Sequence, residues 1–275
     1  MIPAVGPNLP LVDTILGVSD LTLRFAGVAA VDGLSFRLRA GELLGIIGPN
    51  GAGKTSVLNC VNGFYRPQAG RITFLERDVT HAAPHARAAL GISRTFQNIA
   101  LYPHMTVLAN ILSGRLIHMH TNLLACGVYW GPGQREVLTH RERVEQIIDF
   151  LEIEPYRDHL VSELPYGIQK KVELGRALAM EPRLLLLDEP MAGMSVEEKA
   201  DMARYILELR EVHGIPMILI EHDMGVVMDL CDRLIAMDYG RKIAEGPPGE
   251  IQQHPDVIRA YLGEEHGVAE AAGGR

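Results

Sequence analysis

A glycine-rich stretch near residue 50 has the composition and spacing of a phosphate-binding loop. GPNGAGKTS fits the pattern G-x-x-x-x-G-K-[ST], with Gly48, Gly53, Lys54 and Thr55 at its fixed positions. Glycines let backbone N–H groups surround phosphate oxygens, and the helix expected next adds its positive end. Lys54 can reach the β- and γ-phosphates, while the Thr55 hydroxyl can bind Mg²⁺. The residues expected to contact the bound nucleotide are Gly48, Pro49, Asn50, Gly51, Ala52, Gly53, Lys54, Thr55 and Ser56.

A second group of chemically capable residues follows an apolar run, LLLLDEP, that ends in two acids. In open α/β sheets, ligands collect beyond the carboxyl ends of the strands, where such a buried strand would place Asp188 and Glu189. Asp188 can hold Mg²⁺ through water, and Glu189 can polarise an attacking water molecule. The alternative is a solvated turn, but a phosphate-binding loop in the same chain favours a catalytic pair.

The elements that must position these residues alternate between strands and helices. ELLGIIG is a continuous apolar run, typical of a central strand buried on both faces, and it leads directly into the glycine-rich loop. Residues 15–25 and 30–42 alternate between apolar and polar and predict antiparallel strands. The order of strands and helices after residue 180 is that of a largely parallel sheet. The sequence therefore predicts an α/β fold.

Residues 105–151 are predicted to be mainly helical, interrupted by a loop at CGVYWGPGQ, residues 126–134. The domain organisation that follows is a nucleotide-binding core, residues 15–97 and 181–263, split by a helical subdomain, residues 98–180. We expect residues 1–14 to form a flexible arm and residues 264–275 to form a frayed tail.

Composition limits the classes of protein to which the chain can belong. Hydrophobic residues make up 47% of the chain, which excludes general disorder, and the net charge of -8 argues against nucleic acid as a partner. YGIQKK is a candidate local basic patch. Cys60, Cys126 and Cys231 lack metal-like spacing and predict buried thiols in a reducing compartment. No apolar run approaches the roughly 18 to 20 residues of a membrane-spanning helix, so we expect a cytoplasmic protein.

The ordered motifs resemble those of the ATP-binding subunits of ABC transporters from about residue 16 to residue 263. After the glycine-rich loop come RTFQN, LPYGIQ, LLLLDEP and LIEHD. Within that family the chain is most similar to the ATPases of branched-chain amino acid importers, in LRFAGVAAVDGLSF, LPYG, EHDMGVVMDLCDR, HPDVIRAYLGEE and the stretch from residue 114 to 134. Related importers take up urea, short amides and other small solutes. The resemblance implies a P-loop NTPase core with an antiparallel β subdomain and an inserted helical subdomain.

The resemblance also implies roles for individual residues, with ATP and Mg²⁺ as cofactors. Phe25 and Val31 would pack on adenine, Gln97 would contact the metal or the attacking water, and His222 would contact the γ-phosphate. Glu189 would be the catalytic base, and Thr55, Gln97 and Asp188 would serve Mg²⁺. In trans, the helix start at Tyr166 and Gly167 would meet the γ-phosphate bound by a second ATP-binding subunit, with Lys170 and Lys171 nearby.

The chain departs from the usual family signature at two positions. Pro165 and Ile168 replace the common serine and glutamine, and proline offers neither a hydroxyl nor an N–H. Contact with the phosphate must then come from the N–H groups of Tyr166 and Gly167. A lost charge-assisted hydrogen bond is worth about 1.5 to 3 kcal/mol, which implies slower hydrolysis or weaker dimerisation, but not inactivity. MAGMSVEE, after the acids, also lacks the family's usual aspartate.

The expected partners follow from the resemblance. They are membrane permease subunits on other chains, a second ATP-binding subunit in a homodimer or heterodimer, and a solute-binding protein reached indirectly. NIALYPHMTV, at the start of the helical subdomain, is the expected docking face on the cytoplasmic side of the membrane. Two alternatives remain open at this point: the ATPase of a lipopolysaccharide-type exporter, and a nucleotide-gated clamp with little turnover.

Overall fold

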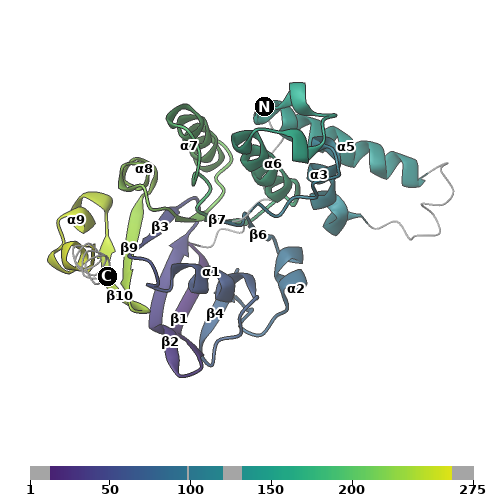
Figure 1. Cartoon of the computed structure of the whole chain (residues 1–275). Coiled ribbons are helices and arrows are strands. Elements are labelled where there is room, and N and C mark those ends of the chain that lie inside the picture. Colours follow the sequence, from purple (N-terminus) through teal and green to yellow (C-terminus); the bar gives the residue numbers. More distant parts are fainter. Residues whose placement is uncertain (1–12, 98, 120–131, 262–275) are drawn as a thin grey trace.

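The computed structural model describes residues 13–97, 99–119 and 132–261. The predicted arm and tail therefore lie almost wholly outside the described residues, as do Cys126 and most of the predicted loop at residues 126–134. Within the described residues, strands form a four-stranded antiparallel sheet and a six-stranded, largely parallel sheet. Helices α3, α5 and α6 lie together to one side of both sheets (Figure 1). The predicted α/β fold is confirmed.

The antiparallel sheet has the strand order β2-β1-β4-β5. Its strands are β1 (Thr14–Phe25), β2 (Val28–Arg39), β4 (Ala69–Phe74) and β5 (Arg77–Asp78). β1 and β2 alternate between buried and more exposed residues, because one face of this sheet packs on the core and the other meets solvent. This alternation is the pattern that the sequence predicted for residues 15–25 and 30–42.

The six-stranded sheet positions the phosphate-binding loop and the acids at one edge. Its order is β10-β9-β3-β8-β7-β6, and its strands are β3 (Leu43–Ile47), β6 (Ile92–Arg94), β7 (Leu184–Asp188), β8 (Met217–Ile220), β9 (Arg233–Asp238) and β10 (Arg241–Gly246). β3 pairs in parallel with β8 and β9, and β7 pairs in parallel with β6 and β8. The carboxyl ends of β3 and β7 therefore lie at the same edge.

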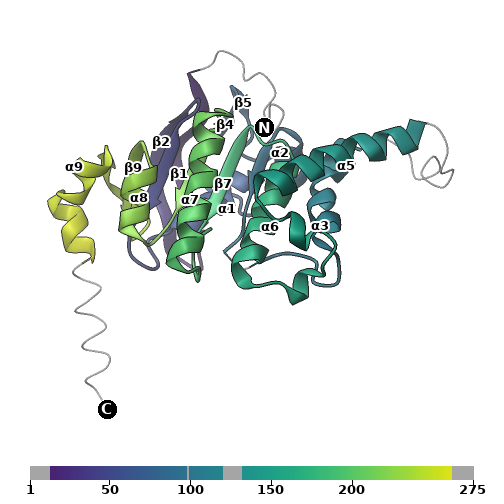
Figure 2. The same cartoon turned by 90° about the horizontal axis from the view of Figure 1, so that it is seen from above.

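Helices cover the sheets and build the side region. Around the sheets lie α1 (Lys54–Asn62), α2 (Pro84–Ala89), α7 (Val196–Glu211), α8 (Met224–Leu230) and α9 (Pro248–Gln252). The side region holds α3 (Val107–Ser113), η1 (Gly114–His118), α5 (Pro132–Phe150), η2 (Glu154–Tyr156), η3 (Val161–Glu163) and α6 (Tyr166–Ala179). From above, α5 extends away from the sheets (Figure 2). The start of α5 corrects the predicted loop at its end: residues 132–134 are helical, since proline suits a first helical position.

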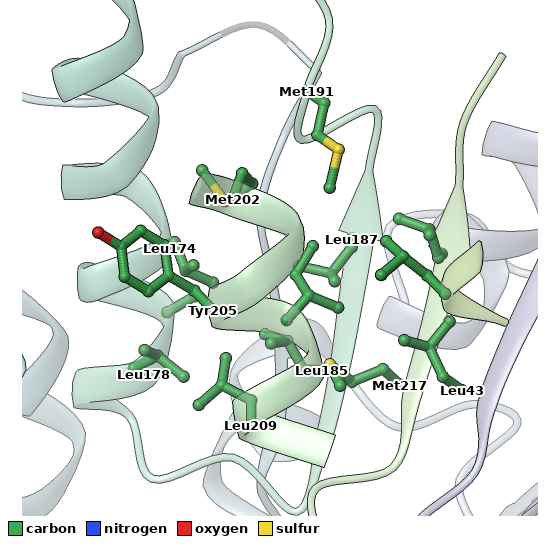
Figure 3. Packing of buried hydrophobic residues seen from close by; sticks show 14 of the residues in the cluster. Leu43, Leu174, Leu178, Leu185, Leu187, Met191, Met202, Tyr205, Leu209 and Met217 are labelled. Atoms are coloured by element: carbon green, nitrogen blue, oxygen red, sulfur yellow. The ribbon is translucent and has the colours of Figure 1, made fainter. Parts of the chain in front are cut away.

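The core consists of two apolar clusters on opposite faces of the parallel sheet. Successive side chains of a strand point to opposite faces, so Leu185 and Leu187 of β7 join one cluster and Leu184 and Leu186 join the other. The first cluster includes side chains of α6 and α7, among them Leu174 (Figure 3). Burial on both faces explains the unbroken apolar runs of β3 and β7.

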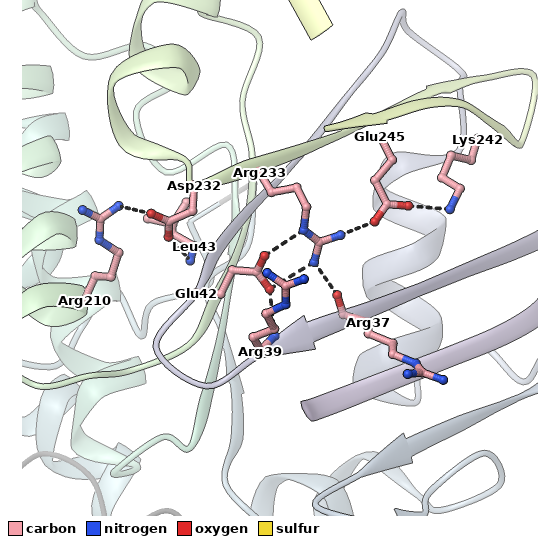
Figure 4. Close-up of polar contacts among 9 residues, drawn as sticks. All are labelled: Arg37, Arg39, Glu42, Leu43, Arg210, Asp232, Arg233, Lys242 and Glu245. Carbon is pink, nitrogen blue, oxygen red and sulfur yellow. Dashed lines mark hydrogen bonds and ion pairs between the residues drawn. The ribbon is translucent and has the colours of Figure 1, made fainter. Parts of the chain in front are cut away.

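A network of hydrogen bonds and ion pairs ties the two sheets together (Figure 4). Arg233, on β9, donates to the Glu42 carboxylate at 2.8 and 3.0 Å and to the Arg37 carbonyl at 2.6 Å. It also pairs with Glu245 of β10. The Leu43 N–H donates to Asp232 at 2.9 Å. These contacts hold the start of β3, the strand that leads into the phosphate-binding loop, against β9.

Candidate active site

The glycine-rich loop connects β3 to α1, as the sequence predicted. Gly48 and Gly53 have φ values of +146° and +99°. A Cβ at Gly48 would lie 2.1 Å from the Met237 carbonyl oxygen, and one at Gly53 would lie 2.1 Å from that of Ala30. Only glycine fits at either position. Gly53 is the N-cap of α1 and makes no side-chain cap bond, so the first turn of the helix directs its N–H groups toward the loop.

Lys54 is folded into the loop that it serves. Its side chain is buried, and its Nζ donates to the carbonyl oxygens of Gly48 at 2.6 Å and Pro49 at 2.9 Å. These carbonyls hold the ammonium group in the place where it can exchange them for phosphate oxygens. The loop therefore carries a positive charge and a ring of N–H donors.

A pocket of about 270 Å³ joins this loop to the predicted catalytic residues. It is lined by Ala30, Asn50, Gly51, Ala52, Gly53, Lys54, Thr55, Ser56, Gln97, Glu189 and His222. Most of the predicted phosphate-contacting residues, together with all three predicted catalytic residues, thus meet in one place.

Glu189 is the centre of a hydrogen-bonded group. Gln97 Nε2 donates to Glu189 Oε2 at 2.9 Å, and His222 Nε2 donates to Glu189 Oε1 at 2.7 Å. The Glu189 backbone has φ +50°, and its N–H donates to the Ile220 carbonyl at 2.9 Å, which fixes the turn beyond β7. Next to His222, burial raises the pKa of Glu221, whose carboxylate accepts the Met191 N–H at 2.8 Å. The hydrogen bonds from Gln97 and His222 thus fix the orientation of the Glu189 carboxylate, which lines the pocket.

Asp188 lies beside Thr55, and a residue that sequence reasoning missed lies on its other side. Thr55 Oγ1 is 3.5 Å from Asp188 Oδ1, and Arg94 Nη2 is 2.6 Å from Asp188 Oδ2. Arg94 also donates to Asn59 Oδ1 at 2.6 Å, and its guanidinium lies over the Phe96 ring. The one available signal was a cation inside the short strand GISRTFQ.

The oxygen atoms at this place suit Mg²⁺. A hydroxyl and a carboxylate oxygen converge at Thr55 and Asp188, and Mg²⁺ commonly takes one or two such side chains plus phosphate oxygens and water. No group of three or more histidine, cysteine or acidic side chains in the described ranges could hold a metal by itself. The donor set therefore fits an ion that arrives with a nucleotide.

The two residues predicted to pack on adenine differ in their exposure to solvent. Phe25 ends β1 with 45% of its surface exposed, and its ring meets that of Tyr65 edge-on at 5.0 Å. Val31 is fully buried in the core, so the prediction that it packs on adenine is wrong. Neighbouring residues of a strand face opposite sides, and it is Ala30 that lines the pocket.

The start of α6 lies away from the pocket of its own chain. Pro165 is the N-cap, Tyr166 begins the helix with 44% of its surface exposed, and a Cβ at Gly167 would meet the Glu198 carboxylate. Tyr166 and Gly167 are not among the residues that line the pocket.

The predicted basic patch at YGIQKK is wrong, because both lysines are buried. Lys170 Nζ donates to the Gln97 carbonyl at 3.0 Å, and Lys171 Nζ donates to Asp201 at 3.1 Å and Tyr205 at 3.2 Å. Their long side chains turn back into the protein and find buried partners. Neither lysine therefore faces an incoming phosphate.

The lysine contact is part of a wider attachment between α6 and the segment that carries Gln97. The Phe96 N–H donates to Glu173 Oε1 at 3.0 Å, and Arg176 donates to the Ala100 carbonyl at 2.5 Å. Burial raises the pKa of Glu173. Three side-chain hydrogen bonds thus join α6 to the backbone around Gln97.

Two family models match the chain. The model described as ABC transporter matches residues 31–192, and the model described as branched-chain amino acid ATP-binding cassette transporter matches residues 241–267. No helix in the described part of the chain combines the length and apolarity that crossing a bilayer requires.

Curated and solved proteins are similar over nearly the whole chain. The high-affinity branched-chain amino acid transport ATP-binding protein BraF of Pseudomonas aeruginosa is 40% identical over 253 residues, covering 91% of this chain and 98% of BraF. A crystal structure of a nucleotide-free ATP-binding cassette from an ABC transporter has a TM-score of 0.79 and 34% identity, covering 90% of this chain and 98% of that chain. The ADP conformation of an ATP-binding cassette of an ABC transporter also has a TM-score of 0.79 and 34% identity, covering 91% and 99%.

Proposed function

The chain belongs to the ABC transporter family as an ATP-binding and ATP-hydrolysing subunit, and on this premise we propose that it energises the import of branched-chain amino acids or a related small solute such as an amide or urea. The observation that carries the proposal is the meeting of Gln97, Glu189 and His222 in one pocket with the Lys54 loop. The relatives support the importer rather than the lipopolysaccharide-type exporter. The intact catalytic group disfavours a clamp without turnover.

In the proposed mechanism, the chain's residues bind the triphosphate and activate water. Lys54 leaves the carbonyls of Gly48 and Pro49 for phosphate oxygens, and the first turn of α1 supplies N–H donors. Thr55 and Asp188 would hold Mg²⁺, which when bound would offset the charge on the phosphates. Glu189 takes a proton from the attacking water, while Gln97 and His222 keep its carboxylate aimed into the pocket.

We further propose that a second ATP-binding subunit, identical or similar, completes the site. Supporting this are the exposure of Tyr166 and the position of the α6 start outside its own pocket. The N–H groups of Tyr166 and Gly167 open a 14-residue helix and present its positive end. They would meet the γ-phosphate held by the other subunit, so that ATP joins two subunits and hydrolysis releases them.

The proposed docking face for the permease subunits lies in the helical subdomain, residues 98–180, beside the Gln97 segment. Tyr102, in this subdomain, is more than half exposed, and so is Phe64 of the nucleotide-binding core, whose ring lies 6.0 Å from that of Phe96. Because α6 is bonded to the Gln97 segment, a partner seated here would sense and drive the position of Gln97. The chain would then sit on the cytoplasmic face of the membrane, with the solute-binding protein acting through the permeases.

Reconstitution tests the proposal directly. The purified chain is combined in proteoliposomes with candidate permease and solute-binding-protein chains from the same organism, and phosphate release is measured with leucine, isoleucine, valine, acetamide or urea. We expect release that at least one of these solutes stimulates. No release with any of them would contradict the importer.

Two variants separate the steps of the mechanism. Glu189→Gln should bind ATP and accumulate as a dimer in gel filtration, because the nucleotide persists between the subunits. Lys54→Ala should lose tight binding in a fluorescent-ATP titration. A Glu189→Gln chain that stays monomeric with ATP and Mg²⁺ would refute the two-subunit site, and unchanged affinity in Lys54→Ala would refute the assignment of the loop.

A further inference from the structure

The end of the described chain touches the first glycine of the phosphate-binding loop. Residues 255–261 are helical, and Val257 anchors them in the core with 4% of its surface exposed. The Tyr261 ring packs against the same cluster. Its hydroxyl accepts a hydrogen bond from the Gly48 N–H at 2.9 Å, across 213 positions of sequence.

Gly48 contacts three different parts of the molecule. Its N–H is bonded to Tyr261, its carbonyl accepts the Lys54 ammonium at 2.6 Å, and its Cα approaches the Met237 carbonyl too closely for any side chain. A shift of Gly48 therefore shifts the carbonyl on which Lys54 rests. The helix of residues 255–261, called the C-terminal helix below, is thus connected to the phosphate-binding lysine through a single residue, Gly48.

We propose that Tyr261 is a positioning residue of the phosphate-binding loop, and that through it the C-terminal helix and the bound nucleotide stabilise one another. This rests on the proposed role of the loop in binding ATP. Coupling between two sites is reciprocal in free energy. If the helix holds the loop in its binding conformation, nucleotide must in turn hold the helix in place.

Tyr261→Phe isolates the hydroxyl, because phenylalanine keeps the ring that packs on the core. The variant leaves the buried Gly48 N–H without this acceptor, and we expect the dissociation constant for ATP to rise about three- to tenfold. The measurement is a fluorescent-ATP titration on the full chain, with circular dichroism to verify that the variant is folded.

Tyr205→Phe is the matched control for a purely structural effect. The Tyr205 side chain is fully buried, and its hydroxyl donates to the Leu151 carbonyl at 3.0 Å, away from the phosphate-binding loop. This variant also removes a tyrosine hydroxyl that makes hydrogen bonds, here with Leu151, Glu152 and Lys171. We expect a lower unfolding midpoint with an unchanged ATP dissociation constant.

Hydrogen exchange tests the reciprocal half of the proposal in the unmodified chain. Adding ATP to the wild type should slow amide exchange in residues 255–261, and adding it to Tyr261→Phe at saturating concentration should not. The inference is overturned if Tyr261→Phe and the wild type have the same dissociation constant for ATP. It is also overturned if ATP leaves the amide exchange rate of residues 255–261 in the wild type unchanged. Neither result touches the proposed function, which the phosphate-release measurement on the wild type in proteoliposomes tests separately.

Discussion

Replacing Arg94 with methionine tests whether its buried ion pair with Asp188 stabilises the active site. The two side chains are 4% and 1% exposed, with Nη2 and Oδ2 2.6 Å apart. Methionine fills much of the space of the arginine stem but leaves the Asp188 carboxylate buried without its cation. Removing one partner of a buried pair costs about 3 to 5 kcal/mol in the free energy of unfolding. In a chain of this length, the midpoint of thermal unfolding should fall by about 5 to 9 °C.

A matched exposed pair provides the control. Arg241 Nη2 lies 2.7 Å from Asp32 Oδ2, almost the same separation, but the arginine is 71% exposed. Water and salt screen such a pair, so Arg241→Met should cost less than about 1 kcal/mol. Both variants are measured by equilibrium urea unfolding without nucleotide.

A double substitution separates the pair from other effects of the change. Adding Asp188→Asn to Arg94→Met removes the stranded charge, so the double variant should lose less stability than the two single losses combined. The reasoning is wrong if Arg94→Met costs no more than Arg241→Met, or if the two changes at the pair are simply additive.

Other consequences of the structure can be measured in the same preparations. Burial raises the pKa of the Glu173 carboxyl above its ordinary 4.5, so above pH 4.5 the folded state binds more protons than the unfolded state. The free energy of unfolding should therefore fall as the pH rises from 4.5 through the raised pKa. Glu173→Gln should remove this contribution to the fall when urea unfolding is measured at a series of pH values from 4.5 upward. Burial raises the pKa of Cys60 to about 11 and of Cys231 to about 12, so neither should react with iodoacetamide in the native chain at pH 7.5, as peptide mass spectrometry can show site by site. Ser195→Ala removes the capping box of α7 and should lower the free energy of unfolding by about 1 kcal/mol, whereas an unchanged urea midpoint would mean that the cap is dispensable.

The features that were predictable from the sequence are those written in a short local pattern. The glycine spacing and Lys54 define the loop between β3 and α1, and the leucine run places Asp188 and Glu189 at the end of β7. The resemblance implied that Gln97 and His222 serve the same site as Glu189, but their hydrogen bonds to Glu189 were not predicted. Their contacts depend on strand order, which places β7 next to both β6 and β8.

The features that could not be predicted depend on register and on distant partners. Val31 and Ala30 are adjacent in sequence, but their side chains point to opposite faces of β2, and only the Ala30 face lines the pocket. Lys170 and Lys171 predict an exposed face when α6 is considered alone, but Glu173, Asp201 and Tyr205 draw them inward. Arg94 carries no mark of its partner, because Asp188 is brought beside it only when β6 pairs with β7.

The position of β3 in the middle of the six-stranded sheet has a consequence for biosynthesis. The β1–β2 hairpin is local and can close while the ribosome is still adding residues, whereas β3 waits for β8 and β9, and its Leu43 N–H finds Asp232 only after 189 further positions. Chains emerge from the N-terminus first, and long-range parallel pairing is slow. A nascent chain thus carries an apolar strand without its neighbours for most of its translation, and such a transiently unpaired strand favours aggregation until the last strands of the sheet appear.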